Sequence, residues 1–148
     1  MQRTTMLKRG SIADIIAGLF ILLFIYAAAS KWLDYEKFLV ELGKSPVLSP
    51  FAQLTAWLIP SMEILISLLL VLERTRHLAL YASFTLMVIF SAYIITILHF
   101  STYIPCSCGG ILEKMGWGQH FWFNMSFVVL GVIGVLCYPN KIKSIIAQ

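Results

Sequence analysis

The stretch at residues 78–100, LALYASFTLMVIFSAYIITILHF, contains no Asp, Glu, Lys or Arg. A helix that crosses a bilayer needs roughly 20 mostly apolar residues, and this stretch is long enough. Three further apolar runs, at 12–29, 51–72 and 119–138, come close to the same length. The sequence therefore predicts four membrane-spanning helices.

The composition of the whole chain agrees with this prediction. Of its 148 residues, 59% are hydrophobic and 12% are charged, and the mean hydropathy is +0.86. These values lie outside the range of soluble globular domains and inside that of integral membrane proteins. We therefore predict an all-α integral membrane protein, a four-transmembrane-helix bundle that forms one domain over residues 1–148. The net charge of +4 comes from basic residues near anionic lipid headgroups, and we expect no nucleic-acid partner.

The basic residues between the spans predict the orientation of the chain, because cytoplasmic loops retain Lys and Arg. Seven lie on the side of the two termini: Arg3, Lys8, Arg9, Arg74, Arg76, Lys141 and Lys143. Four lie on the opposite side: Lys31, Lys37, Lys44 and Lys114. We expect a multi-pass protein of the bacterial inner membrane, with cytoplasmic termini and with the connection between spans three and four in the periplasm.

The first span has an alternative interpretation as a cleavable secretory signal. Its basic start, apolar run and Ala27-Ala28-Ala29 fit such a leader. However, the run is long for a leader, and Lys31 and Trp32 directly after the alanines are typical of an interfacial anchor. We expect the span to be retained.

An amphipathic pattern follows the first span. Apolar residues recur there at three- and four-residue intervals, with charged residues between them: Trp32, Tyr35, Phe38, Leu39 and Leu42. We predict a short amphipathic surface helix that ends near Gly43, with Ser49-Pro50 as the N-cap and first turn of span two. We expect the helix to lie in the headgroup region, and a docking surface for a soluble partner is the alternative.

Glu63 is an acidic residue near the middle of the second span, close to Pro60. An ionised carboxylate is expensive in the membrane, so this side chain should face the interior of the bundle. We favour a structural role, in which a protonated Glu63 forms a hydrogen bond to a neighbouring helix. A proton-coupled or quinone-facing group is the alternative.

Small and polar residues mark expected packing faces on the last two spans. In span three they form the stripe Tyr81, Thr85, Val88, Ala92, Thr96 and His99. In span four they are Asn124, Gly131 and Gly134. Cys137 ends span four on the inner side, and we interpret it as a small apolar filler.

Two thiols stand one residue apart in the segment Cys106-Ser107-Cys108-Gly109-Gly110. Pro105 restricts the chain before them, and the two glycines leave amide N–H groups near the sulfurs, which favours the thiolate. A disulfide across so short a ring is strained and more easily reduced. We therefore predict a redox pair in the periplasm, where disulfides form and persist.

Two histidines flank this segment and are candidate proton acceptors for the thiols. His99 closes span three and His120 opens span four, so both can lie at the same membrane face. A zinc site formed by Cys106, Cys108, His99 and His120 is an alternative, but zinc loops typically place at least two residues between paired ligands. We expect neither a metal nor a cofactor.

Three motifs connect the chain to a known family: Ser30-Lys31-Trp32-Leu33-Asp34, Pro60-Ser61-Met62-Glu63 and Cys106-Ser107-Cys108-Gly109. With the four spans, they resemble the MauE/DoxX-like family of small bacterial membrane proteins. The architecture is also similar to that of vitamin K epoxide reductase-type thiol oxidoreductases. The resemblance implies a four-helix membrane bundle associated with thiol redox. For the namesake it implies methylamine utilisation, through maturation of a disulfide-rich dehydrogenase subunit.

We therefore expect Cys106 and Cys108 to exchange disulfides with a periplasmic thioredoxin-like or disulfide-containing protein, which would make the chain a thiol-disulfide oxidoreductase. In the alternative function, the chain is a non-catalytic assembly or chaperone subunit and the cysteine pair is a structural clip. Direct reduction of a quinone would need a second cysteine pair or another electron route, and we find none in the sequence. Cys137 lies on the inner side and cannot resolve a disulfide of Cys106 or Cys108.

Overall fold

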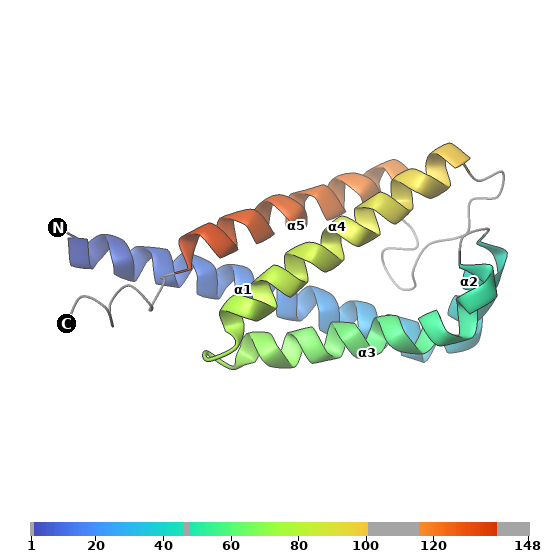
Figure 1. Ribbon diagram of the computed structural model, residues 1–148, viewed down its shortest axis with the longest axis horizontal. Coiled ribbons are helices and arrows are strands. Elements are labelled where there is room, and N and C mark those ends of the chain that lie inside the picture. Colours follow the sequence, from blue (N-terminus) through green and yellow to red (C-terminus); the bar gives the residue numbers. More distant parts are fainter. Residues whose placement is uncertain (1, 46–47, 101–115, 139–148) are drawn as a thin grey trace.

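The computed structural model describes residues 2–45, 48–100 and 116–138. Within these ranges all of the regular secondary structure is helical (Figure 1). The elements are α1 (Gln2–Leu33), α2 (Tyr35–Lys44), the 3₁₀ turn η1 (Ser49–Phe51), α3 (Ala52–Val71), α4 (Arg76–Phe100) and α5 (Trp117–Cys137). The segment that contains Cys106 and Cys108 lies outside the described residues.

Four stretches are long and apolar enough to cross a membrane: Ser11–Leu33, Ser49–Val71, Arg76–His99 and Gly118–Cys137. They coincide with the four predicted runs to within a few residues. The prediction of a four-helix membrane bundle is therefore confirmed, with one short helix, α2, between the first two spans.

The long helices run alternately up and down the bundle (Figure 1). α1 packs against α3 and α5, while α4 packs against α5 and α3. The beginning of α1, the α3–α4 turn and the last turn of α5 lie at one end of the molecule, which we call the terminal end. The end of α1, helix α2 and the beginning of α5 lie at the other end, which we call the α2 end.

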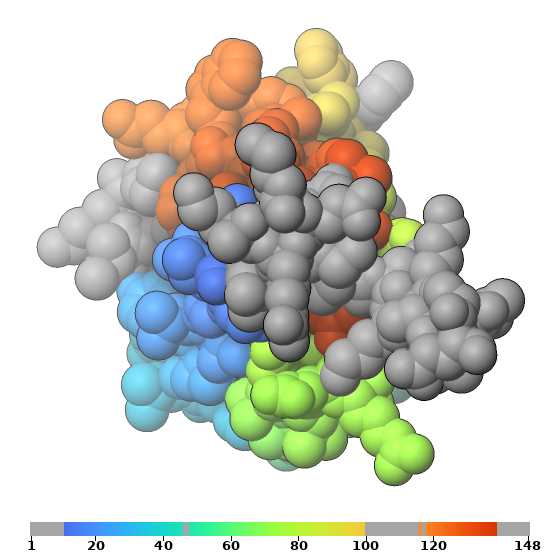
Figure 2. Space-filling view, turned by 90° about the vertical axis from the view of Figure 1, so that its left-hand side faces the viewer, coloured from blue at the N-terminus to red at the C-terminus, as the bar shows by residue number. Residues whose placement is uncertain are grey.

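An ion pair joins α1 to α4 at the terminal end. Nη1 of Arg76, at the start of α4, lies 2.6 Å from Oδ1 of Asp14 on α1. The same guanidinium donates through Nε to the Leu70 carbonyl at 2.9 Å and through Nη2 to the Val71 carbonyl at 3.2 Å. Arg76 therefore joins α1 to carbonyl groups that the end of α3 leaves without helical partners. Figure 2 looks onto this end, where α1 (blue) lies beside the α3–α4 turn (green).

The predicted packing face of α5 is confirmed. Asn124 is 4% exposed, and Gly131 and Gly134 are buried. A Cβ atom on Gly131 would lie 3.2 Å from the Cβ of Phe84, and one on Gly134 would lie 3.0 Å from Cγ2 of Ile16. The two glycines therefore let α5 approach α4 and α1 more closely than larger residues would allow.

The predicted packing face of α4 is wrong. Tyr81 is 47% exposed and Val88 is 40% exposed, and Thr85, Ala92 and His99 are exposed as well. The buried face instead carries Ala79, Leu80, Ser83, Met87, Ser91, Ile94 and Ile97. Ser83 and Ser91 donate to carbonyls of their own helix at 2.8 Å, so they can be buried without a partner from another helix. Because both faces of a membrane helix are apolar, the spacing of hydroxyl groups alone did not identify the buried one.

The amphipathic helix is confirmed as α2, which continues one residue past Gly43 to Lys44. Phe38 and Leu42 are buried and pack against Ala56 of α3. The expected N-cap of span two is wrong, because the 3₁₀ turn η1 begins at Ser49 and no side chain caps the start of α3.

Candidate functional site

A buried ion pair joins α1 to α3. Nζ of Lys31 lies 2.8 Å from Oε1 and 3.1 Å from Oε2 of Glu63, and the two side chains are only 5% and 1% exposed. The same ammonium group donates to the Ala27 carbonyl at 3.3 Å. Three acceptors therefore surround the three N–H groups of Lys31. A buried charge needs such compensation, because moving it out of water is costly.

The position of Lys31 contradicts its interpretation as an interfacial anchor and changes the interpretation of Glu63. Lys31 is 4% exposed, so its interpretation as an interfacial anchor is wrong, whereas Trp32 is 44% exposed. The structure pairs Glu63 with a cation, where the sequence had favoured a protonated acid. Two opposite charges within or beside neighbouring apolar runs were the signal in the sequence. It was missed because Lys31 was assigned to the membrane surface.

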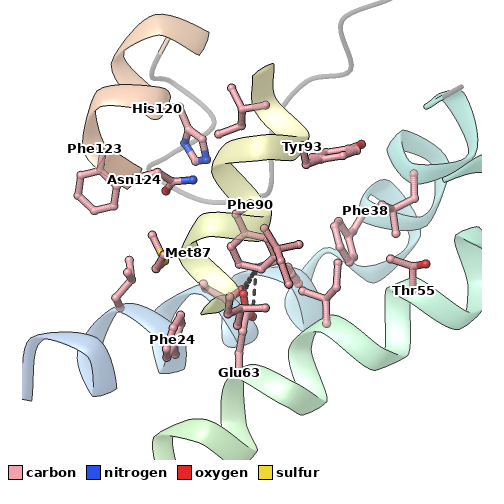
Figure 3. Close-up of a pocket in the computed structure, with 18 of the residues that line it drawn as sticks. Phe24, Phe38, Thr55, Glu63, Met87, Phe90, Tyr93, His120, Phe123 and Asn124 are labelled. Carbon is pink, nitrogen blue, oxygen red and sulfur yellow. Dashed lines mark hydrogen bonds and ion pairs between the residues drawn. The ribbon is translucent and has the colours of Figure 1, made fainter. Parts of the chain in front are cut away.

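A cavity of about 290 Å³ lies beside this pair. Its walls come from all five α-helices, and most of its lining is apolar. Five aromatic side chains contribute to it: Phe24, Phe38, Phe90, Tyr93 and Phe123. Figure 3 shows the ion pair at Glu63, marked by dashed lines, below the ring of Phe90. The cavity was not predicted, because its lining residues converge only when the five helices pack.

Two polar residues of α5 line the cavity one helical turn apart. His120 is 7% exposed and Asn124 is 4% exposed. Both side chains point toward the interior of the cavity in Figure 3. The amide nitrogen Nδ2 of Asn124 is fully buried and has no hydrogen-bond partner among the residues that the structure describes. The spacing of four residues was a sequence signal that placed both side chains on one helix face.

Tyr93 of α4 adds a third polar group to the lining. Its hydroxyl donates to Oγ of Ser45, just after α2, at 3.0 Å. Ser45 is itself fully buried. This bond ties α4 to the end of α2, so the wall of the cavity that these two elements form is held in place.

The predicted site residues are only partly brought together. Glu63 and His120 line the same cavity, whereas His99 is exposed and does not line it. Cys106 and Cys108 lie outside the described residues, so their roles stay predictions. Among the residues that are described, no three His, Cys, Asp or Glu side chains lie close enough to hold a metal ion. Because the zinc alternative includes both cysteines, this finding does not test it.

The fold and the paired charges in its core define a multi-pass helical membrane protein with an internal cavity. The family model described as methylamine utilisation protein MauE matches residues 9–137, a range that contains all four spans. The chain belongs to the MauE family. No curated protein and no solved structure matches the chain significantly.

Proposed function

We propose that this chain is a redox-associated protein of the bacterial inner membrane, in which Cys106 and Cys108 exchange disulfides with a periplasmic protein. The observation that carries the proposal is the Cys-Ser-Cys-Gly-Gly sequence, which lies between two membrane-spanning helices of a MauE-family chain. The family description links such proteins to methylamine utilisation. A thioredoxin-like protein or a disulfide-rich enzyme under assembly is the partner that this chemistry fits.

In the sequence, the excess of Lys and Arg before the first span, between spans two and three and after the fourth span supports a periplasmic position for the pair. The connection that carries the two cysteines starts after Phe100 of α4 and ends before Trp117 of α5. The first turn of α5 lies at the α2 end of the bundle, opposite the beginning of α1 and the last turn of α5 (Figure 1). With the termini in the cytoplasm, the α2 end faces the oxidising compartment, where a disulfide can persist.

The exchange proceeds in two balanced steps. The Cys106 thiolate attacks one sulfur of the partner's disulfide, and the other sulfur of the partner leaves as a thiolate. The Cys108 thiolate then attacks Sγ of Cys106 and releases the partner's second thiolate. Two electrons pass from the pair to the partner, which leaves a Cys106–Cys108 disulfide and a reduced partner. The same steps in reverse oxidise the partner.

Single substitutions test the proposal, with the third cysteine as the matched control. We expect Cys108→Ser to accumulate a mixed disulfide with the partner, because Cys106 can still attack but nothing resolves the product. Cys106→Ser should abolish this species. Cys137→Ser, which changes a half-buried cysteine at the end of α5, should behave as the native chain does. The measurement is non-reducing electrophoresis of alkylated membranes, together with a partner-oxidation assay. Full activity in both single variants of the pair would refute the proposal.

The alternative, in which the pair is a structural clip in an assembly subunit, is separated by a redox titration. An exchanging pair should change state in glutathione buffers near the potentials of thioredoxin-like proteins. A clip should stay oxidised even in a strongly reducing buffer. Alkylation and mass measurement of the pair across the buffer series report which behaviour holds.

A further inference from the structure

We propose that the cavity binds a lipid-soluble molecule with a flat apolar ring and a carbonyl oxygen, the chemistry of a quinone. The residues that line the cavity all lie in the described part of the chain, and neither cysteine of the proposed exchange is among them. The proposal concerns binding and goes beyond the proposed function. It stands on the size of the cavity, its aromatic walls and one buried amide.

The size of the cavity indicates that a ligand fills it. Protein interiors are packed at the density of organic crystals, and they contain few voids larger than a water molecule. A space of about 290 Å³ lies just below the range of about 300–1,000 Å³ that is usual for small-molecule sites. It can hold a head group of one or two rings, and it is too small for a complete long-chain lipid.

The walls favour a flat ring over a saturated chain. Phe24, Phe90 and Phe123 approach the cavity from three different helices, and Tyr93 and Phe38 complete the aromatic lining (Figure 3). Aromatic side chains prefer stacked or edge-on contacts with another π-system, and such contacts add to the gain from area burial. An acyl chain would bury apolar area without that added contribution.

The amide of Asn124 specifies the polar feature of the ligand. Its Nδ2 is a donor that is fully buried and lacks a partner in the described part of the chain. A buried donor is costly unless it meets an acceptor, and a carbonyl oxygen on the ligand would supply one. Two other donors of the lining are already engaged: Nζ of Lys31 contacts Glu63 and the Ala27 carbonyl, and the Tyr93 hydroxyl donates to Ser45. Asn124 is therefore the residue that we expect to select for the carbonyl group.

The ligand can reach the site from the bilayer. Ile89 of α4 lines the cavity and is also 56% exposed, so the cavity extends to the lipid-facing surface of α4. The lining residues on α1, α3, α4 and α5 all lie in membrane-spanning stretches. A molecule dissolved in the membrane would thus enter sideways between helices, with any hydrocarbon tail left in the lipid.

The test compares two flat probes that carry the same four methyl groups on a six-membered ring, one with two carbonyl groups and the other with two C–H groups in their place. Duroquinone is a fully methylated quinone that has no ring hydrogen for a thiol to replace, and durene is the matching hydrocarbon. Binding is measured by equilibrium dialysis with the full chain in nanodiscs of synthetic phosphatidylcholine. We expect duroquinone to bind about tenfold more tightly than durene, because only duroquinone accepts a hydrogen bond from Asn124.

Substitutions locate the site. Asn124→Leu should lower the affinity for duroquinone by about five- to tenfold and leave durene unaffected. Ser126→Ala is the matched control on the exposed side of α5, where the Ser126 hydroxyl donates to its own helix at the Trp122 carbonyl, and it should change neither affinity. Ala27→Leu fills the cavity from α1 and should weaken the binding of both probes. It also tests the site if Asn124→Leu does not fold.

Equal affinities for duroquinone and durene would overturn the proposal, because the cavity would then select only for apolar volume. Binding of duroquinone that is unchanged in Ala27→Leu would overturn it as well, since the probe would then lie elsewhere. Repeating the measurement in Cys106→Ser/Cys108→Ser separates the two hypotheses of function. We expect the same affinity there, whether or not the pair exchanges disulfides.

Discussion

At the scale of single residues, the Lys31–Glu63 pair is the feature that costs most to place inside a bilayer. Both side chains are buried, and each supplies the opposite charge that the other needs at 2.8 Å. Removing one partner leaves an uncompensated charge in a medium that solvates it poorly, which costs more than losing the pair as a whole. The pair is therefore a specific connection between the end of α1 and the middle of α3, and it forms one side of the cavity.

A double-mutant cycle tests this interpretation. We expect Lys31→Met and Glu63→Leu each to lower the free energy of unfolding by about 3–5 kcal/mol. The double variant should be far closer to the native chain than the sum of the two losses predicts. The measurement is reversible unfolding by a denaturing detergent, followed by circular dichroism.

The Lys44–Glu41 pair on α2, whose side chains are 44% and 15% exposed, is the matched control for this cycle. Nζ of Lys44 lies 3.0 Å from Oε1 of Glu41. Lys44→Met should therefore cost about 0–1 kcal/mol. Additive losses for Lys31→Met and Glu63→Leu would show that the two buried residues do not act as a pair.

At the scale of elements, α5 is held by glycines that permit close packing. Gly134 faces Ile16 of α1, where an added Cβ would lie 3.0 Å from the nearest side-chain atom, and Gly131 faces Phe84 of α4. Helix contacts in lipid depend on such approaches, because the bilayer supplies no hydrophobic force between helices. Gly118, in the first turn of the same helix, has nothing within 4 Å of an added Cβ.

These two environments predict opposite effects on stability when a side chain replaces the glycine hydrogen at each position. Gly134→Leu should lower the free energy of unfolding by about 1–3 kcal/mol, because the new side chain overpacks the contact with α1. Gly118→Ala should leave stability unchanged or raise it by up to about 1 kcal/mol, since alanine is the better helix former. The same detergent titration measures both. Equal effects of the two variants would contradict the packing that the structure assigns to Gly134.

Sequence patterns predicted the positions of the helices better than they predicted which face of each helix is buried. Length and hydropathy identified the four spans because a bilayer requires about 20 apolar residues of each, and the period of Phe38 and Leu42 identified α2 because that helix has a polar side. The buried face of α4 was missed because apolar residues cover both of its sides. The pairing of Lys31 with Glu63 was missed because Lys31 was assigned to the membrane surface. The aromatic cavity was missed because its lining residues converge only when the helices pack.

At the scale of the whole molecule, the two ends of the antiparallel bundle carry different residues. At the terminal end, Arg76 of α4 forms an ion pair with Asp14 of α1. The α2 end contains the first turn of α5, with His120 buried there. The cavity and the buried ion pair lie among the residues toward this second end. The proposed ligand site therefore lies in the half of the protein where α5 begins, and it does not depend on the proposed exchange.

Labelling of intact cells with a membrane-impermeant maleimide, before and after reduction, tests most directly whether Cys106 and Cys108 form a redox pair outside the cytoplasm. We expect no labelling of the pair before reduction and labelling of both residues after it. Cys137, at the terminal end, should stay unlabelled throughout. Labelling of the pair that requires permeabilised cells, or that does not change on reduction, would show that the two cysteines are not an oxidised pair outside the cytoplasm.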